Sequence, residues 1–351
     1  MSAAAATMMI DGTLDFDRLA EWMDGEGLER GPIEHVTLLA GGTQNRVLRF
    51  SKGGREFVLR CPPPTPRPES NTTMRREARV LAALAGTDVP HPRLIAACAD
   101  ETIVGVACYL MEPVAGFNPV NGLPALHATD PAMRREMGFA FVDGAAALSR
   151  VDYQAVGLGD FGRPDNFLAR QAGRWRAQLE SYASHAGWPG AAGLPGVERI
   201  ADYLEANRPA DGPPAIIHGD YLLGNVMFRS DGPGLAAIID WELATIGDPL
   251  IDLGWLLATW RGVPPEDLPV LAVEPWIGFP RPDELIGRYR DMSGRDVSAI
   301  DWYFVLACYK LGIILEGTFA RACAGLDPMD QGGRLHQTAI ILFRRALHRI
   351  G

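Results

Sequence analysis

Apolar and polar residues alternate through much of the first third of the chain. In HVTLLAGGTQNRVLRFSKGGREFVLRC (residues 35–61), three apolar stretches are separated by the Gly-containing turns AGGTQN and SKGG, a pattern typical of antiparallel strands joined by hairpins. The following CPPPTPRP ends the third strand, because proline has no N–H for sheet hydrogen bonds. Residues 102–116, TIVGVACYLMEPVAG, are predicted as a further hairpin or strand pair that ends in Pro and Gly.

Helical spacing first occurs in TTMRREARVLAAL (residues 72–84) and dominates after residue 117. Asp130 followed by Pro131, and Asp248 followed by Pro249, are typical helix starts. Further helices are predicted over 163–185, 195–209, 282–291, 298–324 and 330–349. The predicted fold class is α+β. A strand-rich N-terminal lobe with one long helix (residues 1–116) precedes a mainly helical C-terminal lobe (residues 117–351).

Composition narrows the class of protein. The chain has 351 residues, 47% of them hydrophobic and 22% charged, which is globular and enough for two lobes. A net charge of −10 without a Lys/Arg-rich block argues against a nucleic-acid surface. We expect no membrane span, because no apolar run reaches about eighteen residues. The start of the chain has no basic region followed by a long apolar one, so we expect a cytoplasmic protein.

Cysteine and lysine usage add two further constraints. The five cysteines are scattered and form no C-x-x-C pair, which favours buried thiols over a disulfide framework or a zinc site. Only two of the 33 basic residues are lysines, Lys52 and Lys310.

Three polar side chains capable of chemistry lie between two apolar stretches in IIHGDYLLGNVMF (residues 216–228). They belong to an H-G-D-x-x-x-x-N pattern, in which Asp220 is followed by Asn225, and Asp240 ends the apolar run LAAIID fifteen residues later. A polar turn between two strands would explain H-G-D alone. With Asn225 and Asp240 behind it, the pattern favours a Mg²⁺ site, because magnesium takes few protein oxygens and keeps water and phosphate oxygens. Asp220 is then free to accept a proton from an incoming hydroxyl.

HGDYLLGN, IIDWE and GDPLIDLGW together resemble the aminoglycoside phosphotransferase family, which has a protein-kinase-like fold. Choline kinases and the kinase domains attached to some acyl-CoA dehydrogenases are similar. The resemblance extends from about residue 30 to about residue 325. It implies that Asp220 is the general base and that Asn225 and Asp240 are the metal ligands. It also implies that His218 is structural and that Asp252 ties a helix to the catalytic loop.

The nucleotide is expected in the strand-rich lobe. The AGGTQN turn resembles the phosphate loop of the family, although a Gly-Gly turn alone is more often an ordinary hairpin. In FVLR, alternation places Val58 and Arg60 on one face, with Val58 over the adenine and Arg60 in place of the usual kinase lysine. Glu77 falls in the apolar stripe of the long helix and therefore needs a cation, for which Arg60 is the natural partner. The nucleotide-binding residues predicted from these turns, strands and the following hinge YLMEPVAG are Gly41, Gly42, Thr43, Asn45, Val58, Arg60, Glu77, Met111, Glu112 and Val114.

The acceptor is expected to be a small molecule with a hydroxyl group. Only seven residues separate Asp240 from Asp248, whereas a protein kinase has a long activation loop there. The last helices are mostly aromatic and aliphatic, with Asp301 and Glu316 as acids, and either form core or line a partly apolar pocket. The sequence thus predicts an ATP- and Mg²⁺-dependent phosphotransferase. A catalytically silent nucleotide-binding module is the alternative, favoured only by Arg60.

Overall fold

The computed structural model describes residues 14–39, 45–265, 268 and 272–351. The chain divides into two compact units. Unit 1 contains the described residues up to Ala115 together with Ala237–Glu242, and unit 2 contains Gly116–Ala236 with Leu243–Gly351. A short segment that follows much of unit 2 in the sequence therefore packs with unit 1.

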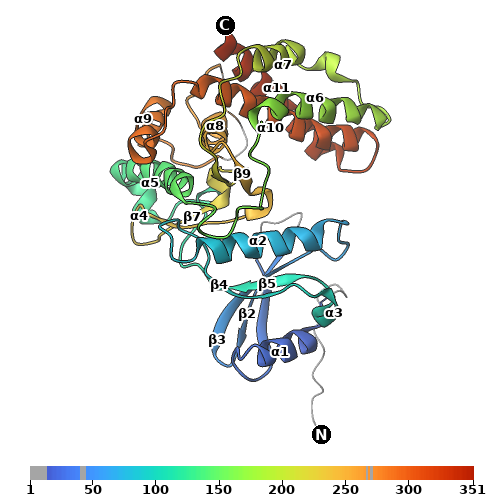
Figure 1. The fold of residues 1–351 in the computed structure, drawn as a ribbon, viewed down its shortest axis with the longest axis vertical. Helices are drawn as coiled ribbons and strands as arrows, with labels where there is room; N and C mark the ends of the chain where they lie inside the picture. Colours follow the sequence, from blue (N-terminus) through green and yellow to red (C-terminus); the bar gives the residue numbers. More distant parts are fainter. Residues whose placement is uncertain (1–13, 40–44, 266–267, 269–271) are drawn as a thin grey trace. The chain divides into compact units, whose positions relative to one another are not determined.

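Unit 1 is built on a five-stranded antiparallel sheet in the order β1-β2-β3-β5-β4 (Figure 1). The strands are β1 (Ile33–Leu38), β2 (Arg46–Lys52), β3 (Arg55–Cys61), β4 (Leu94–Cys98) and β5 (Cys108–Met111). The SKGG turn joins β2 to β3 as predicted, and their register runs from Arg46 opposite Cys61 to Lys52 opposite Arg55. This register fixes which side chains of β3 face each side of the sheet.

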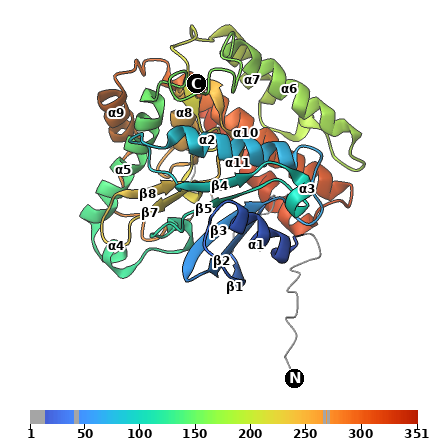
Figure 2. The same ribbon diagram turned by 60° about the horizontal axis from the view of Figure 1, so that its bottom comes forward.

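Helices cover both faces of this sheet (Figures 1 and 2). On one face, Phe57 and Leu59 of β3 join a hydrophobic core with α1 (Phe16–Gly25) and α3 (Glu101–Val104). On the other face lies α2 (Ser70–Leu84), and the alternation of β3 turns Val58 and Arg60 toward it. The long helix expected from the sequence is therefore present, and it holds Arg60 from the side opposite to α1.

Two parts of unit 1 differ from the sequence prediction. The predicted strand pair over 102–116 is wrong for its first half, because Glu101–Val104 forms the short helix α3. The Asp100 side chain caps this helix by accepting from the Thr102 N–H, and Gly105 ends it at φ 90°, a conformation that few other residues adopt. In the structure β5 pairs with β3 on one side and with β4 on the other, and neither β4 nor α1 was predicted from the sequence.

Unit 2 is mainly helical, with two short sheets. Its longer helices are α5 (Pro131–Arg150), α6 (Gln171–Ser181), α7 (Val197–Ala206), α8 (Leu250–Thr259), α9 (Pro282–Ser293), α10 (Ile300–Cys323) and α11 (Met329–Ile350), and the short α4 (Ala125–Thr129) precedes α5. β6 (Ala215–Ile217) pairs with β9 (Thr245–Gly247), and β7 (Val226–Phe228) pairs with β8 (Leu235–Ile238). The Asp130 cap of α5 is present as predicted, since its side chain accepts from the Ala132 N–H.

Helix α10 is the centre of unit 2, where it packs against α11, α8, α6 and α7. Gly254 of α8 allows a close approach, because a Cβ there would lie 2.5 Å from the Tyr303 carbonyl oxygen. By length and composition α10 could cross a membrane, although 67% of its most apolar stretch is buried. Its sequence contains no uninterrupted apolar run of that length, because polar residues are spaced along this helix.

Candidate active site

The predicted catalytic loop, residues 218–225, joins the buried strands β6 and β7 in unit 2. Both carboxylate oxygens of Asp220 accept hydrogen bonds. Asn225 Nδ2 donates to Asp220 Oδ2 at 2.7 Å and to the Asp220 carbonyl at 2.9 Å, while Trp255 Nε1 donates to Asp220 Oδ1 at 2.9 Å. Two neutral donors thus fix the orientation of the Asp220 carboxylate and bring no countercharge to it.

The loop is held in place from α8. Asp252 Oδ2 accepts from the His218 N–H at 2.7 Å, and Asp252 Oδ1 accepts from the Gly219 N–H at 2.9 Å. Burial raises the pKa of Asp252, and His218 and the two backbone donors partly offset that rise. Gly219 has φ 87°, and a Cβ there would lie 2.6 Å from the Leu243 carbonyl oxygen. Only glycine satisfies both the backbone conformation and the close contact.

His218 lies fully buried behind this loop. Its Nδ1 accepts from the Asp220 N–H at 3.3 Å, and its ring packs edge-on against Tyr221. An imidazole with this nitrogen occupied and no exposed surface supports the backbone of the loop rather than reacting with a substrate.

Two residues of the loop environment were not predicted from the sequence. Trp255 follows Asp252 by three positions on α8, so both lie on the helix face that meets the loop. That spacing is a signal from which Trp255 could have been found. Lys310 reaches the loop from α10, where its Nζ donates to the Gly219 carbonyl at 3.0 Å. No local pattern pointed to it, because the surrounding residues of α10 are apolar.

In unit 1, Arg60 and Glu77 form the pair expected from the strand and helix patterns. Arg60 Nε lies 3.0 Å from Glu77 Oε2, and Glu77 is fully buried. Glu77 also accepts from the Tyr109 hydroxyl at 2.9 Å. Burial raises the pKa of Glu77 to about 7, although Arg60 acts in the opposite direction. The pKa of Arg60 is raised by Glu77 and other neighbours despite burial, so its guanidinium stays charged.

Arg60 also binds the segment that returns to unit 1. Its Nη2 lies 2.5 Å from Asp240 Oδ1 and 3.8 Å from Glu242 Oε2. Asn45, the described end of the predicted phosphate loop, donates to Glu242 Oε2 at 3.0 Å. Arg60 therefore contacts three carboxylates. Its contact with Asp240 joins two predicted site residues that are 180 positions apart in the sequence.

The predicted metal ligands supply the oxygens that suit magnesium. Asn225 donates through its nitrogen to Asp220, which leaves the amide oxygen for a cation. Asp240 is about a third exposed and bonds Arg60 through Oδ1, which leaves Oδ2 for a cation. Amide and carboxylate oxygens are each of the kind that magnesium takes from proteins. Within the described residues, no cluster of three or more His, Cys, Asp or Glu forms a denser metal site.

The remaining predicted nucleotide residues are placed as follows. Val58 is buried on the same face of β3 as Arg60. Met111 ends β5, and the next N–H, of Glu112, donates to the Arg93 carbonyl at 2.9 Å. The Glu112 side chain pairs with Arg93 and Arg55. Gly41, Gly42 and Thr43 lie outside the described residues.

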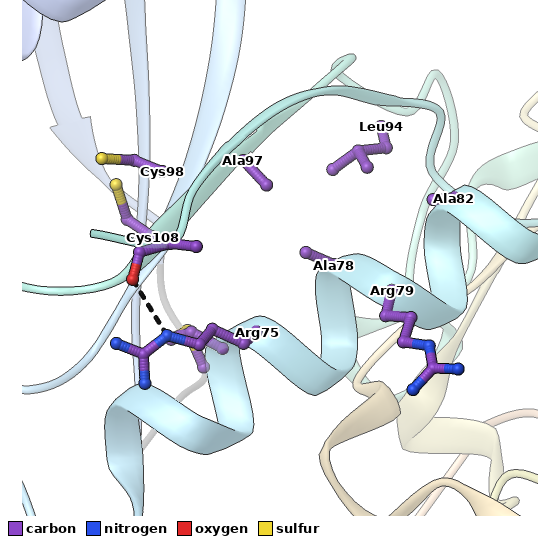
Figure 3. Close-up of a pocket in the computed structure, with 10 residues that line it drawn as sticks. Arg75, Ala78, Arg79, Ala82, Leu94, Ala97, Cys98 and Cys108 are labelled. Atoms are coloured by element: carbon purple, nitrogen blue, oxygen red, sulfur yellow. Dashed lines mark hydrogen bonds between the residues drawn. The ribbon is translucent and has the colours of Figure 1, made fainter. Parts of the chain in front are cut away.

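A separate pocket of about 220 Å³ lies over α2 and β4 in unit 1 (Figure 3). Its lining consists of Met74, Arg75, Ala78, Arg79, Ala82, Leu94, Ala97, Cys98, Ala99 and Cys108. Arg75 crosses one end and donates through Nε to the Ala99 carbonyl at 2.9 Å. None of the predicted nucleotide residues lines this pocket, so we assign it no part in the site.

The sequence model of the phosphotransferase enzyme family (APH) matches residues 35–284. Acyl-CoA dehydrogenase family member 11 of Rattus norvegicus is 27% identical over 348 residues, which are 95% of this chain and 43% of the rat protein. The Homo sapiens protein of the same name is 29% identical over 88% of this chain and 39% of its own length. The chain thus spans less than half the length of these relatives.

Solved structures are similar over nearly the whole chain. A candidate aminoglycoside phosphotransferase from Ralstonia eutropha is 30% identical with a TM-score of 0.77, covering 95% of this chain and 99% of that one. An ethanolamine kinase from Plasmodium vivax has a TM-score of 0.57 at 13% identity, covering 90% of this chain and 83% of that one. These likenesses confirm the predicted kinase-like α+β fold.

Proposed function

The chain belongs to the phosphotransferase enzyme family, and from this premise we propose that it transfers the γ-phosphoryl group of ATP to a hydroxyl group of a small molecule, with Mg²⁺. Asp220 is the proposed general base. As the hydroxyl oxygen forms its bond to the γ-phosphorus, the bond to the β-phosphate oxygen breaks and ADP leaves. The hydroxyl proton passes to Asp220.

The geometry of Asp220 is the observation that carries this proposal. Each carboxylate oxygen receives one neutral donor, from Asn225 or Trp255. Each oxygen keeps lone-pair capacity for a further donor such as an alcohol. A catalytically silent module would have no need of this arrangement, since nucleotide binding alone does not require a positioned base.

Magnesium fits the proposed ligands Asn225 and Asp240, and when bound it neutralises charge on the transferring phosphates. For the nucleotide we propose Arg60 as the phosphate-binding cation, because it is buried, charged and able to form two parallel hydrogen bonds. Glu77 holds Arg60 in place. Gly41, Gly42, Thr43 and Asn45 complete the proposed phosphate loop.

The adenine is proposed to contact Val58 and the backbone at Met111, Glu112 and Val114. Since the Glu112 N–H already donates to the Arg93 carbonyl and Pro113 has no N–H, Val114 is the proposed donor to the base.

The acceptor is proposed to be an alcohol without several positive charges. A polycation would need unpaired carboxylates, yet both acids of α10 already have partners. Glu316 is buried with Trp188 and His336, and Asp301 pairs with Arg349. Related solved structures carry hygromycin B or are named for ethanolamine, and the curated relatives are named for acyl-CoA dehydrogenation. Because α10 forms the core of unit 2, its apolar side chains do not select among these acceptors, and a screen over the acceptor classes decides between them.

The test is a screen for ADP formation from MgATP with aminoglycosides, choline-like alcohols and hydroxyacyl compounds. With the acceptor that responds, Asp220→Asn should lower turnover by about 10²–10⁴-fold, the usual worth of a general base. Asp231→Asn, an exposed carboxylate paired with Arg229, is the matched control and should keep the wild-type rate. ATP binding without consumption under every condition would support the silent module instead.

A further inference from the structure

A partly buried cation, Lys310, lies beside the catalytic loop. Lys310 is one of only two lysines in the chain. The other, Lys52, is fully buried and binds Asp24 and the Glu29 carbonyl near α1. Lys310 instead lies mid-helix on α10, where its Nζ donates to the Gly219 carbonyl at 3.0 Å. A lysine in so apolar a helix needs a reason, because desolvating an ammonium is costly.

Aromatic rings surround the Lys310 ammonium. Its Nζ is 4.4 Å from the ring centroid of Trp255 and 5.6 Å from that of Trp175. Both distances are within the range of cation–π attraction. Trp255 in turn donates to Asp220 Oδ1. The indole therefore contacts the ammonium with its face and the carboxylate with its edge.

The charges that face Lys310 come from three elements. Asp220 of the loop and Asp252 of α8 stabilise the ammonium, while Arg174 of α6 opposes it. Burial is the largest influence and lowers the pKa of Lys310 to about 8. The side chain is thus protonated at neutral pH and loses its proton in mildly alkaline solution.

We propose that Lys310 is a positioning residue for the catalytic loop, whose ammonium holds the Gly219 carbonyl and, through Trp255, the Asp220 carboxylate. This inference rests on the proposed role of Asp220. Gly219 adopts a φ of 87°, a backbone conformation that favours glycine. Asp252 holds its N–H and Lys310 holds its carbonyl, so both peptide groups flanking Gly219 are fixed. The loop sequence HGDYLLGN contains no lysine or arginine, so the cation that contacts the loop comes from Lys310 of α10.

The first test measures the ammonium directly. Protein grown with [ε-¹³C]lysine should give two lysine signals by NMR, and Lys310→Arg assigns them. We expect the Lys310 signal to titrate near pH 8 and to move to lower pH in Asp220→Asn, since the variant removes a stabilising charge. The Lys52 signal should not change between the two proteins. An Asp220→Asn titration of Lys310 identical to the wild type would overturn the proposal.

The second test measures ADP release from MgATP with water as the acceptor. Lys310→Met should lower kcat by about 10- to 100-fold, the effect of a misplaced catalytic group, and should leave the KM for ATP within about twofold. The wild-type rate should fall above about pH 8, and this alkaline fall should be absent in Lys310→Arg, which stays charged. Arg321→Met, an exposed cation on the same helix, is the control and should match the wild type.

The outcomes separate the two proposals. A folded Lys310→Met with the wild-type kcat and pH profile would overturn the positioning role, and melting curves of the Met and Arg variants establish that each is folded. If the wild type releases no ADP above the blank without enzyme, either with water or with any acceptor of the screen, the proposed function fails by itself. The NMR titration then still decides whether Lys310 and Asp220 are coupled.

Discussion

Arg60 is the single residue on which the nucleotide side of the proposal depends most. The sequence placed it opposite Glu77 through two periodicities, one of a strand and one of a helix, and the structure contains that pair. The structure adds Tyr109 and Asp240, which no local pattern could connect to Arg60. An arginine suits this environment because its planar fork reaches two carboxylates at once, whereas a lysine presents one point charge.

The first prediction at this scale is that Arg60→Ala destabilises the fold through Glu77. Removing one partner of a buried pair typically costs about 3–5 kcal/mol, and here the cost should be greatest above about pH 7, where Glu77 is ionised. Arg60→Ala/Glu77→Gln should recover part of the stability but not the affinity for ATP. Denaturant unfolding and ATP titration measure the two quantities. Losses in the double variant equal to the sum of the single losses would show that the residues are not coupled.

The same pair gives a pH dependence with a defined sign. Burial raises the pKa of folded Glu77 from 4.5 to about 7, so folding takes up a proton between these values. Glu77 therefore contributes on the order of 3 kcal/mol to the free energy of unfolding. This contribution is fully present below pH 4.5 and is lost as the pH rises to about 7. Glu77→Gln should remove that part of the pH profile of stability, whereas Glu56→Gln, about half exposed on β3, should keep it.

At the scale of elements, patterns predicted the longer helices and strands but not every short one. Residues 101–104 contain β-branched residues that favour a strand, yet the Asp100 cap and the left-handed Gly105 impose a helical turn. Helical spacing in the sequence begins at Thr72, but α2 begins two residues earlier at Ser70 without a side-chain cap, and Thr73 donates back to the Glu69 carbonyl. Local propensity is a weak guide where tertiary contacts decide the boundary.

Some residues of the candidate site could likewise be predicted from the sequence, and others could not. Asp220, Asn225 and Asp240 could be predicted because their spacing in the chain is itself the signal. Lys310 could not, because it joins the loop from 91 positions away through a contact that only the folded chain creates.

The prediction at the scale of elements concerns the link between α8 and the loop. Asp252→Asn replaces one of two accepting oxygens by an NH₂ group, which then faces a backbone N–H of His218 or Gly219. An unsatisfied buried donor costs about 1–3 kcal/mol, and the loop that carries Asp220 should lose its fixed position. Unfolding and turnover should therefore both be impaired. Asp330→Asn on α11, largely exposed, is the control; equal behaviour of the two variants would contradict the structural role of Asp252.

For the whole molecule, the two units are not contiguous segments of the chain. The segment Ala237–Glu242 follows 121 residues of unit 2 but packs with unit 1. The Ile238 N–H donates to the Pro90 carbonyl, and Asp240 binds Arg60. The proposed metal ligands Asn225 and Asp240, though close in sequence, therefore belong to different units. A contiguous division at residue 116 follows the hydrophobic pattern, which carries no information on such a return.

The prediction at this scale is that magnesium and ATP together stabilise the whole chain, and that Asn225 and Asp240 are both needed for this effect. A ligand at 100 times its dissociation constant stabilises a protein by about 2.7 kcal/mol, which thermal melting detects readily. The gain with MgATP over ATP plus EDTA should disappear in Asp240→Asn and in Asn225→Ala, and should persist in Asp220→Asn because a base does not bind the metal. Asparagine is the suitable replacement at Asp240, since it tolerates the φ of 67° there without a new backbone strain. If either ligand variant keeps the full magnesium-dependent shift, that residue does not hold the metal, and the proposed site loses one of its two protein oxygens.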